Sequence, residues 1–175
     1  MMIVNGLIDA NVHLLQQAQR LLDGMDDGDY AAAGEGVYRS SIGQHLRHCF
    51  DHYLSFIAGM PEGVVDYDRR EREEEVECQT ECACQVLGQL ISGLRDLQRN
   101  GDLATRTVKV LMDYGGSDNQ WQESSVGREL QFLVSHTVHH YAMINEMARQ
   151  RGFLVENGFG IAPSTLRHRE TAGID

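Results

Sequence analysis

The chain has 175 residues, of which 42% are hydrophobic, and this is enough to bury the core of one domain over residues 1–175. Its formal net charge is −11, from 15 basic and 26 acidic residues. An acidic surface of this kind disfavours a nucleic-acid backbone or an anionic membrane as a partner. The N-terminal stretch MMIVNGLIDANVHLL has no basic segment and no small-residue cleavage site, and the chain has no run of 18 apolar residues, so we expect a cytoplasmic protein.

Apolar residues at helical spacing predict four long helices. The second has a clear start, because Ser41 and Gln44 have the spacing of a capping box. Gly152 follows the last helix as a C-terminal stop. The predicted ranges are about 7–22, 41–58, 80–98 and 126–151.

The connecting segments show no helical periodicity. Residues 23–39, rich in Gly and Asp, predict a loop, and the charged stretch 66–79 predicts a solvated connector. In residues 105–123, β-branched and polar residues alternate on either side of GGSDN, which predicts a short hairpin. The tail from residue 153 predicts a loop over one end of the bundle. The fold class is therefore an all-α four-helix bundle with long crossovers and a small β-hairpin between the third and fourth helices.

The last predicted helix contains SHTVHH at residues 135–140. Its spacings of 3 and 4 predict one stripe facing the bundle axis, formed by Leu133, His136, His140, Met143 and Met147. Because His136 and His140 are four residues apart, both imidazoles can bind one metal ion at about 2.0–2.1 Å. His139 lies to one side of this stripe, either supporting a ligand or lying on the surface.

The second predicted helix supplies further histidines. His45, His48 and His52 follow one another at spacings of 3 and 4, on a second stripe. Three imidazoles on a divalent cation leave an open coordination position, where water would have a lowered pKa or a thiolate could bind. The alternative is that the histidines make hydrogen-bonded core contacts or a pH-sensitive seam without any metal.

SIGQHLRH at 41–48 and SHTVHHYAMI at 135–144 resemble the DinB/YfiT-like superfamily, four-helix-bundle proteins with a histidine triad. YDRRER, SSVGRELQF and FGIAPST, at 67–72, 124–132 and 159–165, are similar to a bacterial subgroup of it. The resemblance implies a Zn²⁺ or Ni²⁺ ion on His48, His136 and His140, often in a homodimer, and in some relatives a thiol cosubstrate such as bacillithiol or mycothiol. His45 and His52 depart from the family pattern, so His52 could replace His48 or supply a fourth ligand.

Three functions are compatible with these residues. The first is a metal-dependent enzyme of thiol transfer or hydrolysis, in which Asp51 or Glu129 orients a ligand imidazole. The second is a non-catalytic metal-binding or stress-linked protein, and the third is a metal-free helical interaction module. Four residues of the charged connector would shape a pocket for an anionic substrate in the enzyme: Tyr67, Asp68, Arg70 and Arg72.

Three of the four cysteines are close together in the sequence. Cys78, Cys82 and Cys84 have a spacing unlike the CxxC pair of zinc sites, and we expect a reduced cluster rather than a disulfide framework.

Overall fold

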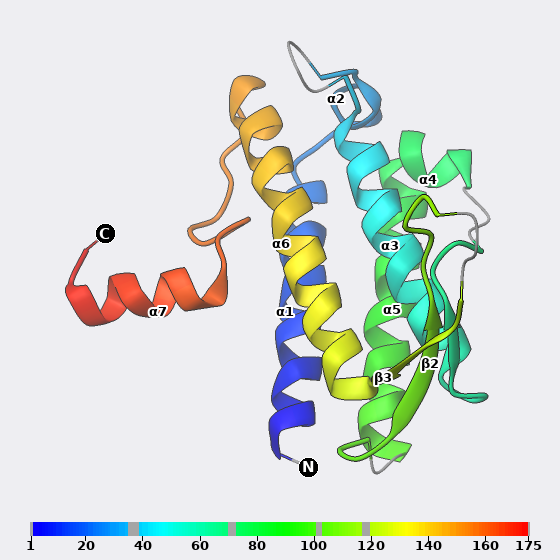
Figure 1. The fold of residues 1–175 in the computed structure, drawn as a ribbon. Coiled ribbons are helices and arrows are strands. Elements are labelled where there is room, and N and C mark those ends of the chain that lie inside the picture. The colour runs from blue at the N-terminus through cyan, green and yellow to red at the C-terminus, as the bar shows by residue number, and fades with distance from the viewer. Residues whose placement is uncertain (1, 35–38, 70–72, 101–102, 117–119, 175) are drawn as a thin grey trace.

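Four long helices make up an elongated bundle in this computed structural model, which describes residues 2–34, 39–69, 73–100, 103–116 and 120–174 (Figure 1). They are α1 Met2–Leu22, α3 Ile42–Gly59, α5 Thr80–Asn100 and α6 Val126–Gln150. Both α1 and α3 pack against α5 and α6. The predicted all-α bundle is confirmed. None of the described helices is long and apolar enough to span a membrane.

The ends of α3 and α6 are set by serine caps. The Ser41 hydroxyl accepts from the Gln44 backbone N–H at 3.0 Å, and the Gln44 side chain accepts from the Ser41 N–H at 3.1 Å, so the predicted capping box is present. At the start of α6, Ser125 accepts from the Arg128 N–H at 3.2 Å. Local chemistry therefore fixes where both histidine-bearing helices begin.

Two short helices lie in segments for which loops were predicted. They are α2 Asp27–Ala31 and α4 Glu74–Cys78, and each packs against α3. The Tyr30 side chain is fully buried, and its hydroxyl donates to the Val76 carbonyl at 2.7 Å, which joins α2 to α4. The loop predictions were wrong here because these helices of five residues each are stabilised by tertiary contacts rather than by a periodic apolar face.

A small sheet lies beside α3 (Figure 1). Its strands are β1 Val64–Asp66, β2 Thr107–Leu111 and β3 Gln122–Ser125, in the order β1-β2-β3. The antiparallel β2–β3 pair, with Val108 opposite Ser124, confirms the predicted hairpin. The parallel partner β1 was not predicted. A Cβ on Gly59 would lie 2.3 Å from the Val64 carbonyl oxygen, so the close approach of β1 to α3 requires glycine.

The C-terminal segment is not the loop that the sequence predicted. Phe159 stacks on Tyr141 of α6, with ring centroids 4.4 Å apart and 3° between the ring planes. Beyond it, α7 Pro163–Ala172 has no buried residue and extends away from the bundle (Figure 1).

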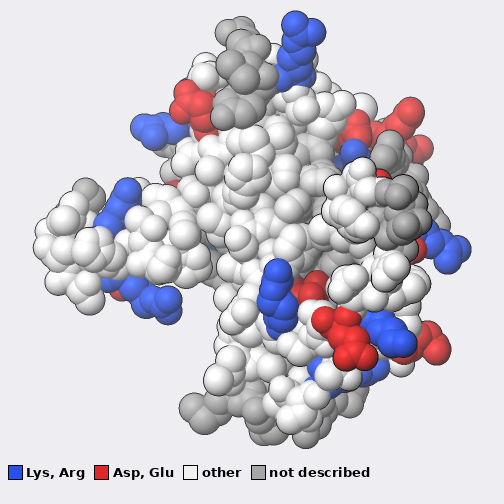
Figure 2. Space-filling model, in the orientation of Figure 1, with Lys and Arg blue, Asp and Glu red and all other residues white. Residues whose placement is uncertain are grey.

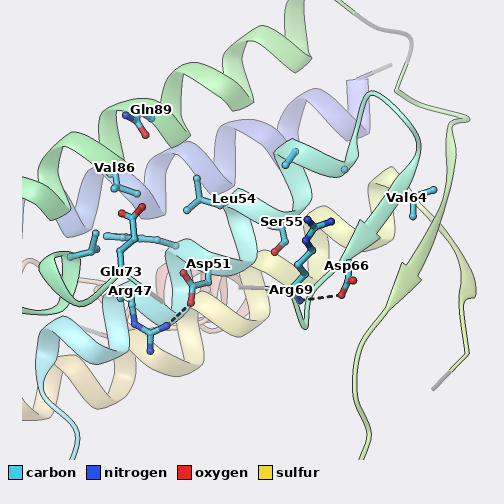
Figure 3. A pocket seen from close by; sticks show the side chains of 14 residues that line it. Arg47, Asp51, Leu54, Ser55, Val64, Asp66, Arg69, Glu73, Val86 and Gln89 are labelled. Atoms are coloured by element: carbon cyan, nitrogen blue, oxygen red, sulfur yellow. Dashed lines mark hydrogen bonds and ion pairs between the residues drawn. The ribbon is translucent and has the colours of Figure 1, made fainter. Parts of the chain in front are cut away.

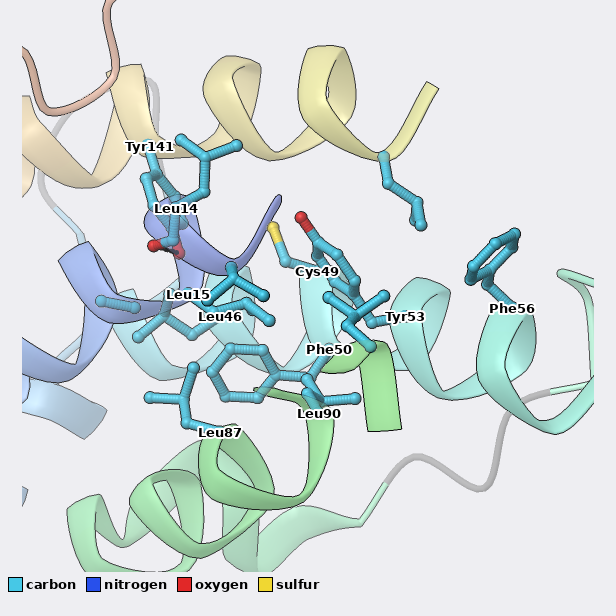
Figure 4. Packing of buried hydrophobic residues seen from close by; sticks show 14 of the residues in the cluster. Leu14, Leu15, Leu46, Cys49, Phe50, Tyr53, Phe56, Leu87, Leu90 and Tyr141 are labelled. Carbon is cyan, nitrogen blue, oxygen red and sulfur yellow. Dashed lines mark hydrogen bonds between the residues drawn. The ribbon is translucent and has the colours of Figure 1, made fainter. Parts of the chain in front are cut away.

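The core between α1, α3 and α6 contains a buried polar chain. Asn11 donates to the Leu130 carbonyl at 3.1 Å and accepts from the Tyr53 hydroxyl at 2.8 Å. That hydroxyl in turn accepts from Thr137 at 3.1 Å. Tyr53 lies among the apolar side chains of the core (Figure 4). Because buried polar groups must be satisfied, this chain specifies how α3 lies against α6.

Candidate metal centre

The histidines of α3 and α6 meet where these two helices pack together. The Nε2 atoms of His48 and His136 lie 3.2 Å apart. One ligand atom from each of His48, His136 and His140 lies within 4.8 Å of the other two. The tertiary structure thus brings together the three histidines that the sequence singled out, from positions 88 residues apart in the chain.

These three histidines are half-buried rather than part of the core. On α6 the side chains that face the core are Leu133, Thr137, Tyr141 and Ile144, which are fully buried. Of the predicted stripe toward the bundle axis, Leu133 and Met147 are buried, whereas His136, His140 and Met143 are half-buried. The buried face is centred about one residue, or roughly 100° of helical rotation, away from the two histidines. The histidine group lies at the rim of the α3–α6 interface, within reach of a solute.

The spacing of the imidazole nitrogens fits a shared metal ion. Two nitrogens bound at 2.0–2.1 Å in tetrahedral geometry lie about 3.3 Å apart. The His48–His136 separation of 3.2 Å agrees with this value. The His136 Nδ1 atom is buried and has no hydrogen-bond partner among the described residues. No hydrogen bond at Nδ1 therefore fixes the orientation of this ring. The donor set fits a divalent transition-metal ion of the kind that imidazole binds.

Burial keeps the two imidazoles of α6, His136 and His140, neutral. Burial first, and then the neighbouring His52 and His140, lowers the pKa of His136 to about 2. Burial and the nearby His45 lower the pKa of His140 to about 4. A neutral imidazole has a free lone pair, which a metal ligand needs and an imidazolium lacks. The α6 pair is therefore ready to bind a cation across the neutral pH range.

His45 and His52 extend the group along α3. His52 is buried, its Nδ1 donates to the His48 carbonyl at 2.8 Å, and its ring lies 4.2 Å from that of His136. The Nδ1 atoms of His45 and His140 lie 3.0 Å apart. His139 is exposed, with its ring 5.3 Å from that of His140. Five imidazoles thus form a continuous row, with the compact group of three at its centre. The row consists of His45, His48, His52, His136 and His140.

Tyr67 is the predicted pocket residue that lies beside this row. It is 2% exposed, and its ring lies 5.5 Å from that of His52 at an angle of 27°. Its hydroxyl donates to Glu129 at 2.9 Å, and the other oxygen of Glu129 accepts from Ser124 at 2.5 Å. Burial and the Glu129 charge raise the pKa of Tyr67. Glu129 therefore holds Tyr67 in place, a role that the sequence did not indicate.

The other predicted site residues are less involved. Asp68 is exposed, and Arg70 and Arg72 lie outside the described residues. Asp51, expected as a partner of a ligand imidazole, pairs with Arg47 at 2.5 Å. The cysteines are free thiols: Cys49 is buried, Cys78 is exposed, and Cys82 and Cys84 are half-buried.

Comparison with known proteins identifies the family. The sequence profile of the DinB superfamily matches residues 12–144, which include all five histidines of the row. FK506-binding protein 5 of Rhizopus delemar is 33% identical over 108 residues, which are 60% of this chain and 27% of that protein. The chain thus spans about a quarter of the length of this curated relative.

A solved structure shows the same fold. It is that of a DinB-like protein from Bacillus cereus, which aligns with a TM-score of 0.61 over 87% of this chain and 95% of that one. The sequence identity is 15%, so this likeness concerns the fold alone. Because the family profile covers most of the sequence, and the fold agrees with it, this chain belongs to the DinB superfamily.

Proposed function

We propose that this protein is a metal-dependent enzyme of the DinB type, which holds one divalent ion on His48, His136 and His140. The observation that carries the proposal is the convergence of three half-buried imidazoles whose ligand atoms lie within 4.8 Å of one another. Three protein ligands leave room for a further ligand on a tetrahedral ion, as in catalytic rather than structural sites. A bound divalent ion supplies a Lewis acid that lowers the pKa of water or a thiol.

The surrounding residues orient the imidazoles and limit the access of water. Phe132 packs against His136 and Tyr67, with ring centroids 5.5 and 5.3 Å apart, and forms an aromatic wall on one side. His52 donates to the His48 carbonyl and so ties successive turns of α3. In Figure 2, the middle of the face over α3 and α6 is mostly free of Lys, Arg, Asp and Glu. An uncharged surface of this kind suits a substrate that is not strongly charged, although the chain as a whole has a net charge of −11.

We further propose zinc or nickel as the ion and a low-molecular-weight thiol as cosubstrate, so that the reaction is thiol transfer, with hydrolysis as the alternative. Imidazole is a common ligand of both ions, and a thiolate is a soft ligand that binds well in an open position. Membership of the DinB superfamily supports this assignment. The expected homodimer stays a prediction, which sedimentation velocity would test.

The first test is the metal content of protein purified without an affinity tag, measured by inductively coupled plasma mass spectrometry. We expect about one zinc or nickel ion per chain, and its loss in His136→Ala and in His140→Ala. His168→Ala is a matched control, because His168 is exposed on α7. Stoichiometric metal in both α6 variants would refute the three-histidine site. Loaded protein would then be screened with thiols and electrophilic acceptors, and metal-dependent turnover is the expected result.

A second candidate is a metal-binding protein without turnover, and the position of His52 favours considering it. Because His52 Nδ1 donates to the His48 carbonyl, the free lone pair of a neutral His52 is on Nε2. The centroids of the His52 and His136 rings lie 4.2 Å apart. A fourth imidazole would close the site. X-ray absorption on the zinc-loaded protein separates the two: three imidazoles and one exchangeable light atom favour the enzyme, and four imidazoles favour the structural role.

A further inference from the structure

A pocket of about 530 Å³ lies beside α3 on a face that none of the histidines occupies (Figure 3). Arg47, Asp51, Leu54, Ser55 and Ala58, which recur at helical spacing, form its α3 wall. This face is turned by roughly 100° around α3 from the face that carries His48 and His52. The remaining walls come from β1, α4, α5 and the residues that follow β1 and precede α4.

The pocket extends along α3. Its α3 wall runs from Arg47 to Gly59, which at 1.5 Å per residue is about 18 Å of helix. Val76 of α4 lies toward the Arg47 end. Its neighbour Glu77 packs against Gly43, near the start of α3, so closely that a Cβ on Gly43 would overlap the Glu77 backbone. Val64 lies toward the other end, where Gly59 approaches the β1 backbone. The two ends therefore present different chemistry to one ligand.

The end near Arg47 carries excess negative charge. Arg47 bridges Asp51 and Glu77, each at 2.5 Å, so one guanidinium is shared by two carboxylates. Glu73 lines the same end and is in no ion pair among the described residues. In Figure 3 its carboxylate lies near Val86 and Arg47. This end suits an ammonium group.

The other end carries a guanidinium. Figure 3 shows the Arg69 side chain directed into the pocket beside Ser55, with Leu54 between this pair and Glu73. Asp66 uses one oxygen to accept from the backbone N–H groups of Asp68 and Arg69, at 3.0 and 3.2 Å, which fixes the position of Arg69. Among the described residues, no carboxylate forms an ion pair with the Arg69 guanidinium. A guanidinium beside a hydroxyl suits a carboxylate.

The middle of the pocket is apolar. Leu54 lies there, between Glu73 and Arg69 (Figure 3), and its side chain is 42% exposed, which is high for a large aliphatic side chain at the edge of a core. A simple anion would meet the excess negative charge at the Glu73 end, and a simple cation would meet Arg69. From this distribution we infer a second ligand site, for a small amphiphile with a carboxylate at one end, an ammonium at the other and an apolar segment between them.

The inference is independent of the metal centre, and its test is arranged accordingly. Binding of 8-aminooctanoate, octanoate and octylamine would be measured by isothermal titration calorimetry, with EDTA present so that no carboxylate can bind a metal ion. We expect the zwitterion to bind at least tenfold more tightly than either singly charged analogue. A series of ω-amino acids of six to twelve carbons then gives the length that spans the two ends.

Two exposed residues supply the variants. Arg69→Gln should weaken the binding of 8-aminooctanoate and octanoate about tenfold and should not weaken octylamine, whose repulsion by Arg69 it removes. Glu73→Gln should weaken the binding of 8-aminooctanoate and octylamine and should not weaken octanoate. Arg167→Gln on α7 is the control and should change none of the three. Circular dichroism melts would establish that each variant is folded. Equal affinities for the three compounds, no binding at millimolar concentration, or losses that do not follow charge would overturn the inference.

Discussion

The Nε2 atoms of His48 and His136 lie 3.2 Å apart although the residues belong to different helices, 88 positions apart in the sequence. Two imidazole nitrogens at this distance either share one proton or bind one cation, because two bare lone pairs would repel each other. The pair joins α3 to α6 in both cases. A metal ion bound there would stabilise the folded state, since the unfolded chain does not hold the two nitrogens together.

The first prediction concerns which histidine of α3 is the ligand. Replacing His48 with alanine should reduce bound metal to a small fraction of one ion per chain, because only two ligands of the compact group remain. Replacing His45 should leave the metal in place, since its contact is to the His140 ring. Metal analysis after dialysis of both variants checks this. Retention by His48→Ala together with loss from His45→Ala would move the site by one turn of α3.

The second prediction is a pH dependence of the metal-free protein. Folded His136 has a pKa of about 2, against an ordinary value of 6.5, so between these values the unfolded chain binds a proton that the folded chain does not. The unfolding free energy therefore increases as pH rises through this window and stops increasing, for this group, above about pH 6.5. Urea unfolding at pH 5 and pH 7 measures the slope. It should be smaller in His136→Gln, and an unchanged slope would contradict the neutral state of His136.

The third prediction tests the support behind Tyr67. Tyr67→Phe removes the donor to buried Glu129 and should cost about 1–3 kcal/mol of unfolding free energy. In Glu129→Gln the amide can still accept from Tyr67, so the loss should come mainly from the weaker, uncharged bond. A double-mutant cycle with both substitutions should show a coupling energy of about 0.5–3 kcal/mol. Additive effects would mean that the 2.9 Å bond contributes little.

The fourth prediction concerns the loop that holds Phe159 on α6. Gly160 has φ +71°, and a Cβ there would lie 2.6 Å from backbone atoms of Tyr141 and Ala142. Gly160→Ala should destabilise the protein by more than the roughly 1–2 kcal/mol cost of a left-handed alanine. Gly152→Ala is matched, because Gly152 has φ +82° with open space around the Cβ position. Equal melting temperatures for the two variants would show that the loop moves away from α6 at little cost.

The fifth prediction concerns α7. Its residues from Arg167 onward are exposed as far as the structure describes them. Ending the chain after Leu166 should therefore change the unfolding free energy by about 0.5 kcal/mol or less, as surface changes do. Urea unfolding of the shortened chain is the measurement. A larger loss would show that α7 packs against something in solution, such as a second copy, and light scattering would then be required.

Much of the fold could be predicted from local patterns. The apolar spacing of α5, the Ser41–Gln44 capping box and the alternation around Val108 each act within a few residues, so the sequence contains the whole signal. The short elements could not be predicted in this way. The α2 helix depends on burial of Tyr30 against α4, and β1 depends on pairing with β2, far away in the chain.

The sequence by itself determined that His136 and His140 share one side of a helix and that a second helix carries His45, His48 and His52, because side-chain direction within a helix follows from residue spacing. Only the tertiary structure decided that His48 is the residue that meets His136, and that the group lies at the rim instead of the core. The relative rotation of α3 and α6 depends on the hydrogen bonds that join Asn11, Tyr53 and Thr137 across three helices. No local sequence pattern contains that information.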